Sequence, residues 1–546
     1  MKGLTHLLSS IKHEPLYSGR DSMIESIEFD SRSCSAGSLF VAVKGFSLDG
    51  HDYLASAYEN GCRAFVVERK VDFSAEDISM ALVADSSKAI ALLSNSFFES
   101  PSKEIKLIGI TGTNGKTTCA TLMYDLFMGL GHKTGLLSTV VNKIGDNAVK
   151  ATHTTPNPVE LNKLLREMVN ANCSHCFMEV SSHAIDQNRV FGLHFSGGVF
   201  TNISHDHLDY HKTFSAYIKA KKEFFDHLPQ SAFALVNTDD KNALVMLQNT
   251  KANQVHYALK TPADFKAKVL ENELSGLVLN LDDTEFYSRL IGRFNAYNLL
   301  AVYAVSTLLG EDKIETLGVL SNLKSVEGRF QYLKVSGGPT TIVDYAHTPD
   351  ALKNVLETIK AVKQTSARLI TVVGCGGDRD KDKRSIMGEI ANNYCDKIFL
   401  TDDNPRYENP KKIRNQIKKK ISRSKLVEIA SREKAIKAAI ESLNSGDILI
   451  VAGKGHEIYQ EYKGKKKFFS DKKCILKGIN SKNKKLFKNW KANILHEQCN
   501  LNLISKNLKI NKASINSKNI SRNDVFFSIK GPKNDGNNYA DEAIKK

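Results

Sequence analysis

The sequence of 546 residues contains no run of about 18 or more apolar residues, which argues against a membrane-spanning helix, so we expect no contact with a membrane. The first residues, MKGLTHLLSSIKHEPLYSGR, also lack a long apolar core and a small-residue cleavage site, so we expect no signal peptide. Cysteine is scarce, and nine cysteines, an odd number, fit reduced thiols better than a disulfide framework. These absences together predict a cytoplasmic protein.

The charge of the chain is unevenly distributed. Lys and Arg exceed Asp and Glu by 16, but residues 460–546 alone contain 20 Lys and one Arg against four Asp and three Glu. This tail therefore carries +14, and the other 459 residues carry only +2. The tail is rich in Lys and Asn without regular interleaving of aromatic residues, which favours compositional drift over a nucleic-acid-binding patch. We expect no nucleic acid among the partners.

The pattern of apolar runs predicts an α/β protein of several domains. A chain of 546 residues with 41% hydrophobic and 25% charged residues is typical of about three or four globular domains. Strands followed by helices, such as KLIGIT before TTCATLMYDLFMGLG, recur along it. Many strands end in Gly, Asp or His, at the edge of a parallel sheet where ligands bind. The predicted domains span residues 1–100, 101–328, 329–488 and 489–546.

The sequence repeats itself once. Residues 30–57 and 516–543 align without a gap at an offset of 486. Two copies are too few for a solenoid. The alternatives are coincidence and a second protein of the same kind that begins here and is cut short at Lys546. Between them, residues 477–493 are rich in Lys and Asn and are predicted to be an exposed, weakly structured linker.

The segment GITGTNGKTT follows a predicted strand and opens a predicted helix. A phosphate-binding loop needs this setting, because glycines let backbone N–H groups approach phosphate and a helix N-terminus favours an anion. Lys116 would reach the β- and γ-phosphates, and the Thr117 hydroxyl would bind Mg²⁺. Ile110 departs from the general pattern, which has glycine there. We predict ATP and Mg²⁺ at this loop; a glycine-rich turn without a ligand is the alternative.

Two further segments carry possible metal ligands. Glu179 in MEVSSH ends a predicted strand, where a carboxylate can bind Mg²⁺. The segment TNISHDHLDYH holds three His and two Asp within seven residues, which also suggests zinc, but no thiolate or HExxH helix accompanies it. Cys173 and Cys176 have no second pair and lead into a predicted strand, so core cysteines are favoured over ligands.

Together, the motifs resemble the Mur ligases of peptidoglycan synthesis. GITGTNGKTT, MEVSSH, TNISHDHLDYH, GRFNAYN, VDYAHTPDAL, GCGGDRDKDKR, TDDNPR and VAGKGHE occur in the family's order. The resemblance runs from about Ser31 to about Asp471 and accounts for Ile110, because this family uses the spacing GxxGxxGKT. It is greatest for the ligases that add the third residue of the stem peptide. From about Asn493 the tail resembles the start of the ligase that adds D-Ala-D-Ala.

The resemblance implies the three-domain Mur ligase fold: a small N-terminal α/β domain for UDP, a central P-loop ATPase with a parallel sheet, and a C-terminal Rossmann-like domain. It implies an ATP- and Mg²⁺-dependent, amide-forming ligase that joins meso-2,6-diaminopimelate to UDP-N-acetylmuramoyl-L-alanyl-D-glutamate through an acyl phosphate. We expect a monomer. The alternatives are the same reaction with L-lysine, a folylpolyglutamate-type ligase, which DNPR and AGKGHE disfavour, and a nucleic-acid-binding P-loop ATPase.

Carried over by motif, the resemblance assigns site residues to each ligand. The catalytic residues would be Lys116, Lys221, His207 and Glu179. The nucleotide would be bound by Gly112, Thr113, Asn114, Gly115, Lys116, Thr117, Thr118, Asn295, Asn298, Arg329 and Asp344. The UDP-substrate would be bound by Ser31, Phe46, Ser47, Leu48, Thr154, Thr155, Ser181, Gln187 and Arg189. Mg²⁺ would be held by Thr117, Glu179, His207 and a carbamylated Lys221. Diaminopimelate would contact Arg379, Asp403, Asn404, Pro405, Arg406, Gly453 and Glu457.

The assignment of Arg406 also has a physical argument of its own. Arg406 can grip the distal carboxylate of diaminopimelate with two parallel hydrogen bonds, while L-lysine would leave it unpaired; the alternative for DNPR alone is an ordinary proline turn. Glu457 would face the substrate ammonium. For Lys221 the alternative is a basic helix face formed with Lys219 and Lys222; the resemblance favours the modified lysine, because Tyr217, Ala220 and Lys221 match the family's Y-x-x-A-K position.

Overall fold

The computed structural model of the chain describes residues 1–17, 21–45, 48–151, 153–333, 339–488, 513–514, 518, 520–521, 524–528 and 536–545. Contacts divide the chain into two compact units. The first comprises residues 1–331, 348–363 and 379–383, and the second comprises residues 332–347, 364–378 and 384–546. In the described part, no helix is both long and apolar enough to cross a membrane.

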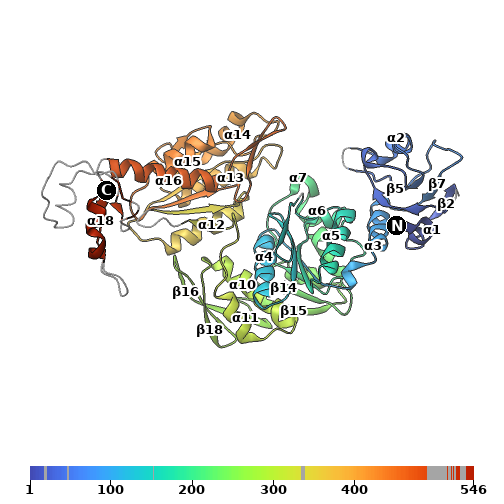
Figure 1. The fold of residues 1–546 in the computed structure, drawn as a ribbon, viewed down its shortest axis with the longest axis horizontal. Helices are drawn as coiled ribbons and strands as arrows, with labels where there is room; N and C mark the ends of the chain where they lie inside the picture. Colours follow the sequence, from blue (N-terminus) through green and yellow to red (C-terminus); the bar gives the residue numbers. More distant parts are fainter. Residues whose placement is uncertain are drawn as a thin grey trace. The chain divides into compact units, whose positions relative to one another are not determined.

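A five-stranded sheet begins the first unit (Figure 1). Four neighbouring strands are parallel, and β2 is antiparallel at the edge. Side chains alternate along β5: Leu39 and Val41 pack in one core with α1 and α3, whereas Phe40 packs in the other with α2. The strand order is β2 (Glu14–Tyr17), β7 (Ser79–Leu82), β6 (Ala64–Val67), β5 (Ser38–Val41) and β4 (Ser26–Glu28), and the helices are α1 (Leu4–Leu8), α2 (Leu54–Glu59) and α3 (Ser86–Phe97).

An eleven-stranded sheet follows in the same unit (Figure 1). The seven strands from β9 to β16 in the sheet order are parallel, and antiparallel strands extend both edges. The order is β11 (Asn147–Val149), β10 (Asn142–Ile144), β9 (Thr134–Leu137), β12 (His175–Glu179), β8 (Lys106–Thr111), β13 (Gly197–Phe200), β14 (Phe233–Asn237), β15 (Asn253–Ala258), β16 (Phe265–Glu273), β17 (Gly276–Leu281) and β18 (Thr284–Ser288).

Helices cover both faces of this sheet. Ile108 and Ile110 of β8 pack in a core with α4 and α10, while Leu107 packs in a second core with α5 and α8. The helices of this region are α4 (Lys116–Gly129), α5 (Pro158–Asn170), α6 (Ser182–Asp186), α7 (Leu208–His211), α8 (Phe214–Asp226), α9 (Ala243–Leu247), α10 (Arg293–Leu308) and α11 (Lys313–Leu320); α12 (Pro349–Val362) is also assigned to the first unit.

The second unit is built on a six-stranded sheet with a buried pair beside it. Five neighbouring strands, from β20 to β23, are parallel. Helices α15 and α16 pack on the sheet, where Arg432 and Asp471 form an ion pair with no exposed side-chain surface. The order is β19 (Gln331–Leu333), β20 (Thr340–Asp344), β24 (Ile448–Ala452), β21 (Leu369–Val373), β22 (Lys397–Leu400) and β23 (Leu426–Glu428), with the hairpin β25 (Tyr459–Tyr462) and β26 (Lys465–Phe468) and the helices α13 (Lys383–Tyr394), α14 (Pro410–Ile417), α15 (Arg432–Glu441) and α16 (Asp471–Lys488).

The linker predicted over residues 477–493 is wrong in its first part. Residues up to Lys488 belong to α16, and Ile475 and Ile479 of that helix are buried in the core of the second unit. The two isoleucines stand four residues apart, which is helical spacing, but the many Lys and Asn residues around them hid this stripe. The rest of the predicted linker lies outside the described residues.

The described part of the tail reproduces one strand pair of the N-terminal sheet at the offset of the sequence repeat. There β27 (Ala513–Ser514) pairs in parallel with β28 (Val525–Phe526), and 486 residues earlier Ile27 and Glu28 pair in the same register with Leu39 and Phe40. A 3₁₀ helix and an α-helix follow in both copies, at Gly50–Tyr53 and α2 and at Gly536–Tyr539 and α18 (Ala540–Ile544). The second, partial domain stays a prediction. Of the matched tail residues, Ser517, Lys530, Gly531 and Asp535 lie outside the described residues.

Truncation should separate the contribution of α16 from that of the tail. A chain ending at Lys491 should keep the thermal unfolding temperature of the second unit, because α16 and the Arg432–Asp471 pair remain. A chain ending at Ser470 should unfold at a much lower temperature, since losing one partner of a buried ion pair typically costs about 3–5 kcal/mol. Calorimetric unfolding checks this, and equal temperatures for both truncations would contradict it.

Candidate active site

The glycine-rich loop lies where β8 ends and α4 begins, and it has no room for a side chain at Gly112 or Gly115. Gly112 and Gly115 have φ values of +151° and +91°. A Cβ atom on Gly115 would lie 2.8 Å from Asn298 Oδ1, and one on Gly112 would collide with Thr201 Oγ1. Two positions of the loop at the N-terminus of a long helix therefore need glycine, which fits close approach of the backbone to the phosphate groups of a nucleotide.

Lys116 lies over this loop. Its Nζ donates to the carbonyl oxygens of Gly112 and Thr113, both at 2.8 Å. Burial lowers the pKa of Lys116 below its ordinary value, while the nearby carboxylates of Glu179 and Asp206 raise it. A phosphate oxygen is a stronger acceptor for an ammonium than a carbonyl, so this side chain can bind the nucleotide with little movement.

Thr117 and Glu179 meet beside the loop. Thr117 Oγ1 donates to Glu179 Oε2 at 2.9 Å, and Arg329 Nη2 donates to Thr117 Oγ1 at 3.0 Å. Glu179 Oε1 accepts from Thr139 N at 2.7 Å. A hydroxyl and a buried carboxylate next to a phosphate loop fit Mg²⁺, which takes one or two protein oxygens together with phosphate and water. Among the described residues there is no group of three or more His, Cys, Asp and Glu that could hold a metal ion.

Lys221 reaches the same loop from α8. The residue is 1% exposed, and its Nζ donates to Gly112 O at 2.9 Å. Burial, followed by the nearby charge of Lys116, lowers the pKa of Lys221 well below its ordinary value. The predicted partner His207 has a left-handed backbone (φ 55°), and its Nε2 lies 3.4 Å from Asp206 Oδ2. Burial lowers the pKa of His207 to about 3, so its imidazole is neutral at pH 7.

The other predicted nucleotide residues surround the loop in the first unit. Asn298 Oδ1 accepts from Cys119 Sγ of α4 at 3.4 Å, and its Nδ2 donates to Asn295 Oδ1 at 3.0 Å. Asn114 N donates to Asn202 Oδ1 at 3.0 Å, which fixes the loop from β13. Thr118 is buried in α4. Asp344 ends β20 in the second unit and stays a prediction for the nucleotide site.

The predicted residues for the muramoyl-dipeptide, from the segments before α5 and after β12, form one hydrogen-bonded network. Thr155 Oγ1 donates to Glu179 O at 2.8 Å and lies 3.4 Å from Ser181 Oγ. Arg189 Nη1 donates to Thr155 O at 2.9 Å, and Arg189 also contacts Gln187. Thr154 Oγ1 accepts from Thr139 Oγ1 at 3.1 Å. The structure therefore brings Thr154, Thr155, Ser181, Gln187 and Arg189 together next to Glu179.

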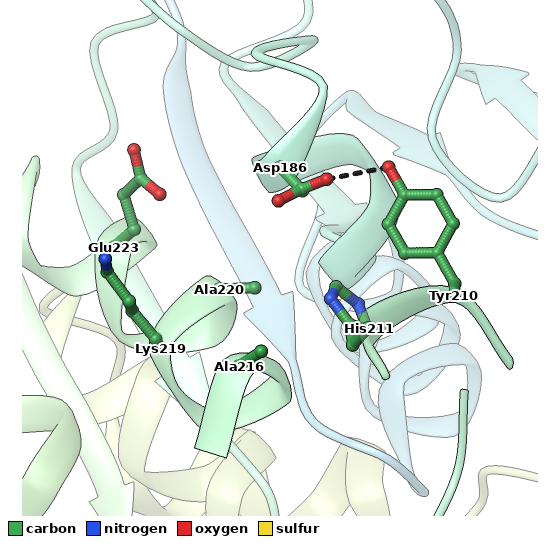
Figure 2. A pocket seen from close by; sticks show the side chains of 7 residues that line it. All are labelled: Asp186, Tyr210, His211, Ala216, Lys219, Ala220 and Glu223. Carbon is green, nitrogen blue, oxygen red and sulfur yellow. Dashed lines mark hydrogen bonds between the residues drawn. The ribbon is translucent and has the colours of Figure 1, made fainter. Parts of the chain in front are cut away.

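Tyr210 and Asp186 extend this network, and the sequence motifs assign a role to neither. Gln187 Nε2 donates to Tyr210 OH at 3.1 Å. Tyr210 and Asp186 line a hollow of about 450 Å³ between α6, α7 and α8, where Figure 2 shows their side chains joined by a hydrogen bond. The only sequence signal was the tyrosine between the histidines of TNISHDHLDYH. The other residues of the wall are His211, Ala216, Lys219, Ala220 and Glu223.

The residues predicted for the UDP end are described only in part. Ser31 is buried in a 3₁₀ helix, and its carbonyl accepts from Asn60 Nδ2 at 2.9 Å. Leu48 is 66% exposed, and its carbonyl accepts from Gly45 N at 2.8 Å. Phe46 and Ser47 lie outside the described residues.

In the second unit, the DNPR segment and the AGKGHE segment form a charged cluster. Asn404 Nδ2 donates to Glu457 Oε2 at 2.9 Å. Lys454, which the sequence did not single out, is fully buried and donates to Asn404 Oδ1 at 2.9 Å and to Glu457 Oε2 at 2.8 Å. Gly453 has φ +110°, and a Cβ atom there would lie 2.7 Å from Asp403 Oδ2. The sequence pattern did not indicate a role for Lys454, because a lysine among glycines is typical of a surface loop.

Arg406 is held in place from two sides. Its Nη1 donates to Gly377 O at 2.7 Å, and its Nε lies 3.8 Å from Glu461 Oε2. Glu461 is a second residue that the sequence missed, because it reaches Arg406 only through the hairpin of β25. Pro405 precedes Arg406, whose φ is 52°. Arg379 is assigned to the first unit, so its membership of this cluster stays a prediction.

Three family models match the chain in sequence order. They are the Mur ligase family catalytic domain at residues 23–98, the Mur ligase middle domain at 110–306, and the Mur ligase, glutamate ligase domain at 328–455. The protein named UDP-N-acetylmuramoyl-L-alanyl-D-glutamate--2,6-diaminopimelate ligase from Cytophaga hutchinsonii is 52% identical over 84% of this chain and 95% of its own length. The protein of that name from Parabacteroides distasonis is 51% identical over 84% and 96%.

Solved structures agree with these matches. A structure of a ligase with the same name has a TM-score of 0.62 and 31% identity, covering 84% of this chain and 95% of that one. MurF from Thermotoga maritima in complex with ADP has a TM-score of 0.57 at 20% identity, covering 84% and 98%. The second likeness concerns the fold alone.

Removing the loop lysine should weaken nucleotide binding without unfolding the protein. Lys116→Ala should lower the affinity for a non-hydrolysable ATP analogue by about tenfold or more, because a charge-assisted bond to phosphate is lost. Titration calorimetry measures this, with Lys222→Ala as the control, since Lys222 pairs with Asp226 on α8. Unchanged affinity in a normally folded Lys116→Ala protein would exclude the loop as the phosphate site.

Proposed function

Because the chain belongs to the Mur ligase family, we propose that it is an ATP-dependent, amide-forming ligase that adds meso-2,6-diaminopimelate to UDP-N-acetylmuramoyl-L-alanyl-D-glutamate. The observation that carries the proposal is the meeting of Lys116, Thr117 and Glu179 at the glycine loop, in a chain 52% identical to a relative named for this reaction. ATP use follows from the family and from the geometry of the loop.

The chemistry requires an activated carboxylate. A carboxylate is a poor electrophile, so ATP first converts it to an acyl phosphate; the amine of the third residue then attacks, and phosphate leaves from a tetrahedral intermediate. Bringing phosphate and carboxylate together concentrates negative charge, which Lys116 at the loop offsets. Mg²⁺ would be held by Thr117 and Glu179, with a second ion at Glu179, His207 and the modified Lys221, and would supply further charge neutralisation.

The substrate would lie along the network beside Glu179. Arg189 offers a guanidinium, and Thr155 and Ser181 offer hydroxyls, to the carboxylate and amide groups of the muramoyl-dipeptide. The nucleoside end would contact Ser31 and the segment of Phe46, Ser47 and Leu48. Asn295, Asn298, Arg329 and Asp344 would surround the nucleotide.

For the incoming amino acid we propose the DNPR cluster. Arg406 keeps a fixed orientation through Gly377 O and Glu461, which suits bidentate binding of the distal carboxylate of diaminopimelate. Asp403, Asn404 and Glu457 would receive its ammonium group, and Arg379, Pro405 and Gly453 would complete the pocket. L-lysine lacks the distal carboxylate, so the site would discriminate against it.

We also propose that Lys221 is carbamylated. Its Nζ is buried against a backbone carbonyl, and a neutral amine is the form that attacks CO₂. The nitrogen would bond to the carbon of CO₂ and release one proton to solvent, which turns the neutral amine into an anionic carbamate able to bind Mg²⁺.

The setting of the enzyme is part of the proposal. We expect a cytoplasmic location, which fits the eight cysteines of the described part, all of them free thiols. The monomeric state and the domain bounds 1–100, 101–328, 329–488 and 489–546 stay predictions.

The reaction itself is tested by omission. Purified protein with ATP, Mg²⁺, the UDP-muramoyl-dipeptide and meso-diaminopimelate should form the ligated product, with one phosphate released per product. Leaving out either substrate should stop product formation. Phosphate release that instead depends on DNA or RNA would contradict the proposal and support the P-loop ATPase alternative.

Lys221→Ala should be inactive and partly rescued by short carboxylates such as acetate or formate, which can take the place of the carbamate. The measurement is ligation with increasing carboxylate, with Lys219→Ala on the exposed face of α8 as the control. Full activity without CO₂, together with no carbamate signal after incubation with carbon-13 bicarbonate, would contradict the modification.

Arg406→Ala or Arg406→Lys should weaken the use of diaminopimelate by about 2–5 kcal/mol in kcat/KM, since one side of a hydrogen-bonded charge pair is lost. L-lysine should remain a poor substrate. Kinetics with both amino acids measure this, and Arg423→Ala, at an exposed arginine of the same unit, serves as the control. A wild type that prefers L-lysine, or a loss below about threefold, would show that Arg406 does not bind the distal carboxylate.

A further inference from the structure

We propose that Tyr210 and Asp186 are positioning residues, which set the direction of the Gln187 amide and through it the orientation of the Arg189 guanidinium. The inference rests on the proposed function, in which Gln187 and Arg189 hold the muramoyl-dipeptide. It adds two residues that touch no substrate themselves.

The four side chains form a continuous chain of hydrogen bonds. Tyr210 OH donates to Asp186 Oδ2 at 2.7 Å (Figure 2). Gln187 Nε2 donates to Tyr210 OH at 3.1 Å, and Gln187 Oε1 accepts from Arg189 Nη2 at 2.6 Å and from Arg189 Nε at 3.1 Å. At the far end, Arg189 Nη1 donates to Thr155 O at 2.9 Å.

The direction of this chain follows from its two ends. An ionised carboxylate can only accept, so Tyr210 uses its single proton on Asp186 and can only accept from Gln187. Gln187 therefore turns its NH₂ group to Tyr210 and its oxygen to Arg189. The two ends of an amide have nearly the same shape, and the reversed amide would aim an NH₂ group at a guanidinium, which only donates. Burial and the hydrogen bond to Asp186 raise the pKa of Tyr210, so the phenol keeps its proton.

This chain of hydrogen bonds fixes the Arg189 guanidinium next to the proposed reaction site. Three N–H groups of Arg189 are engaged with Gln187 and Thr155, and the hydroxyl of Thr155 donates to Glu179 O at 2.8 Å. A guanidinium has five N–H groups, so two remain to bind an anionic group of the substrate. A guanidinium already held in its binding orientation loses less conformational entropy on binding.

The ring of Tyr210 is held separately from its hydroxyl. Its centroid lies 4.2 Å from that of His183 and 4.8 Å from that of His211. Tyr210→Phe should therefore keep the packing and remove only the hydrogen bonds.

The first test is a comparison of Michaelis constants. Tyr210→Phe should raise the KM for the UDP-muramoyl-dipeptide by about tenfold, the loss expected for a hydrogen bond to a charged network, and leave the KM for ATP unchanged. The matched control is Tyr303→Phe, which removes a similar hydrogen bond to Asp282 Oδ2 (2.9 Å) in the same unit. The control should change neither constant.

The second test removes the constraint on the direction of the chain. Asp186→Asn replaces an acceptor-only carboxylate with an amide whose NH₂ group can also donate to Tyr210, so the Gln187 amide is no longer held in one direction and the KM should rise. In the double variant Asp186→Asn/Gln187→Glu the total charge is unchanged, and the carboxylate introduced at position 187 can accept from both Tyr210 and Arg189. The KM of the double variant for the UDP-muramoyl-dipeptide should return much of the way to the wild-type value. If Asp186 only stabilised the fold, the second substitution would not restore the KM.

A crystal structure of Tyr210→Phe separates this inference from the proposed function. In that structure the side-chain amide of Gln187 should be reversed, or the Arg189 guanidinium should no longer donate to Thr155 O. If both stay in place, or if the KM is unchanged, the positioning role is refuted. A wild type that forms no product refutes the proposed function instead, and the crystal structure still decides the role of Tyr210.

Discussion

The hydrogen bond between Thr117 Oγ1 and Glu179 Oε2 joins the parts of the proposed active site in the first unit. It connects the first turn of α4 with the last residue of β12, and it can form because β12 and β8 are parallel neighbours with Glu179 opposite Ile110. Arg329 donates to the same hydroxyl of Thr117. Thr139 N donates to the carboxylate of Glu179, and Thr155 Oγ1 donates to its backbone carbonyl. The residues proposed for the nucleotide, the cation and the substrate therefore converge on Glu179 at the sheet edge.

Two lysines give this site its electrostatic character. Lys116 and Lys221 both donate to Gly112 O, from the loop and from α8. Two cations near one carbonyl repel each other, and after burial this repulsion is the main cause that lowers the pKa of Lys221. Carbamylation would replace the repulsion with an attraction, and the phosphate groups of ATP would offset the charge of Lys116. The arrangement is thus suited to ligands that carry several negative charges.

The sequence predicted those features that depend on local pattern. The strand–loop–helix order located Lys116 and Thr117, and a carboxylate at a strand end located Glu179. Tyr210, Lys454 and Glu461 act through contacts between distant segments, which no local pattern reveals. The linker was misjudged because Ile475 and Ile479 are a two-residue stripe among many polar residues. The repeat at an offset of 486 was visible in sequence, and the shared strand register in the tail gives it a structural counterpart.

The central claim is that ligation proceeds through an acyl phosphate formed at the glycine loop. It is tested most directly by labelling the reacting carboxylate of the UDP-muramoyl-dipeptide with oxygen-18 and analysing the released phosphate. If the carboxylate attacks the γ-phosphate, one of its oxygens leaves with phosphate, so each phosphate should carry one labelled oxygen per ligated product. Unlabelled phosphate, with the oxygen-18 that leaves the carboxylate found in AMP or in water instead, would contradict the account.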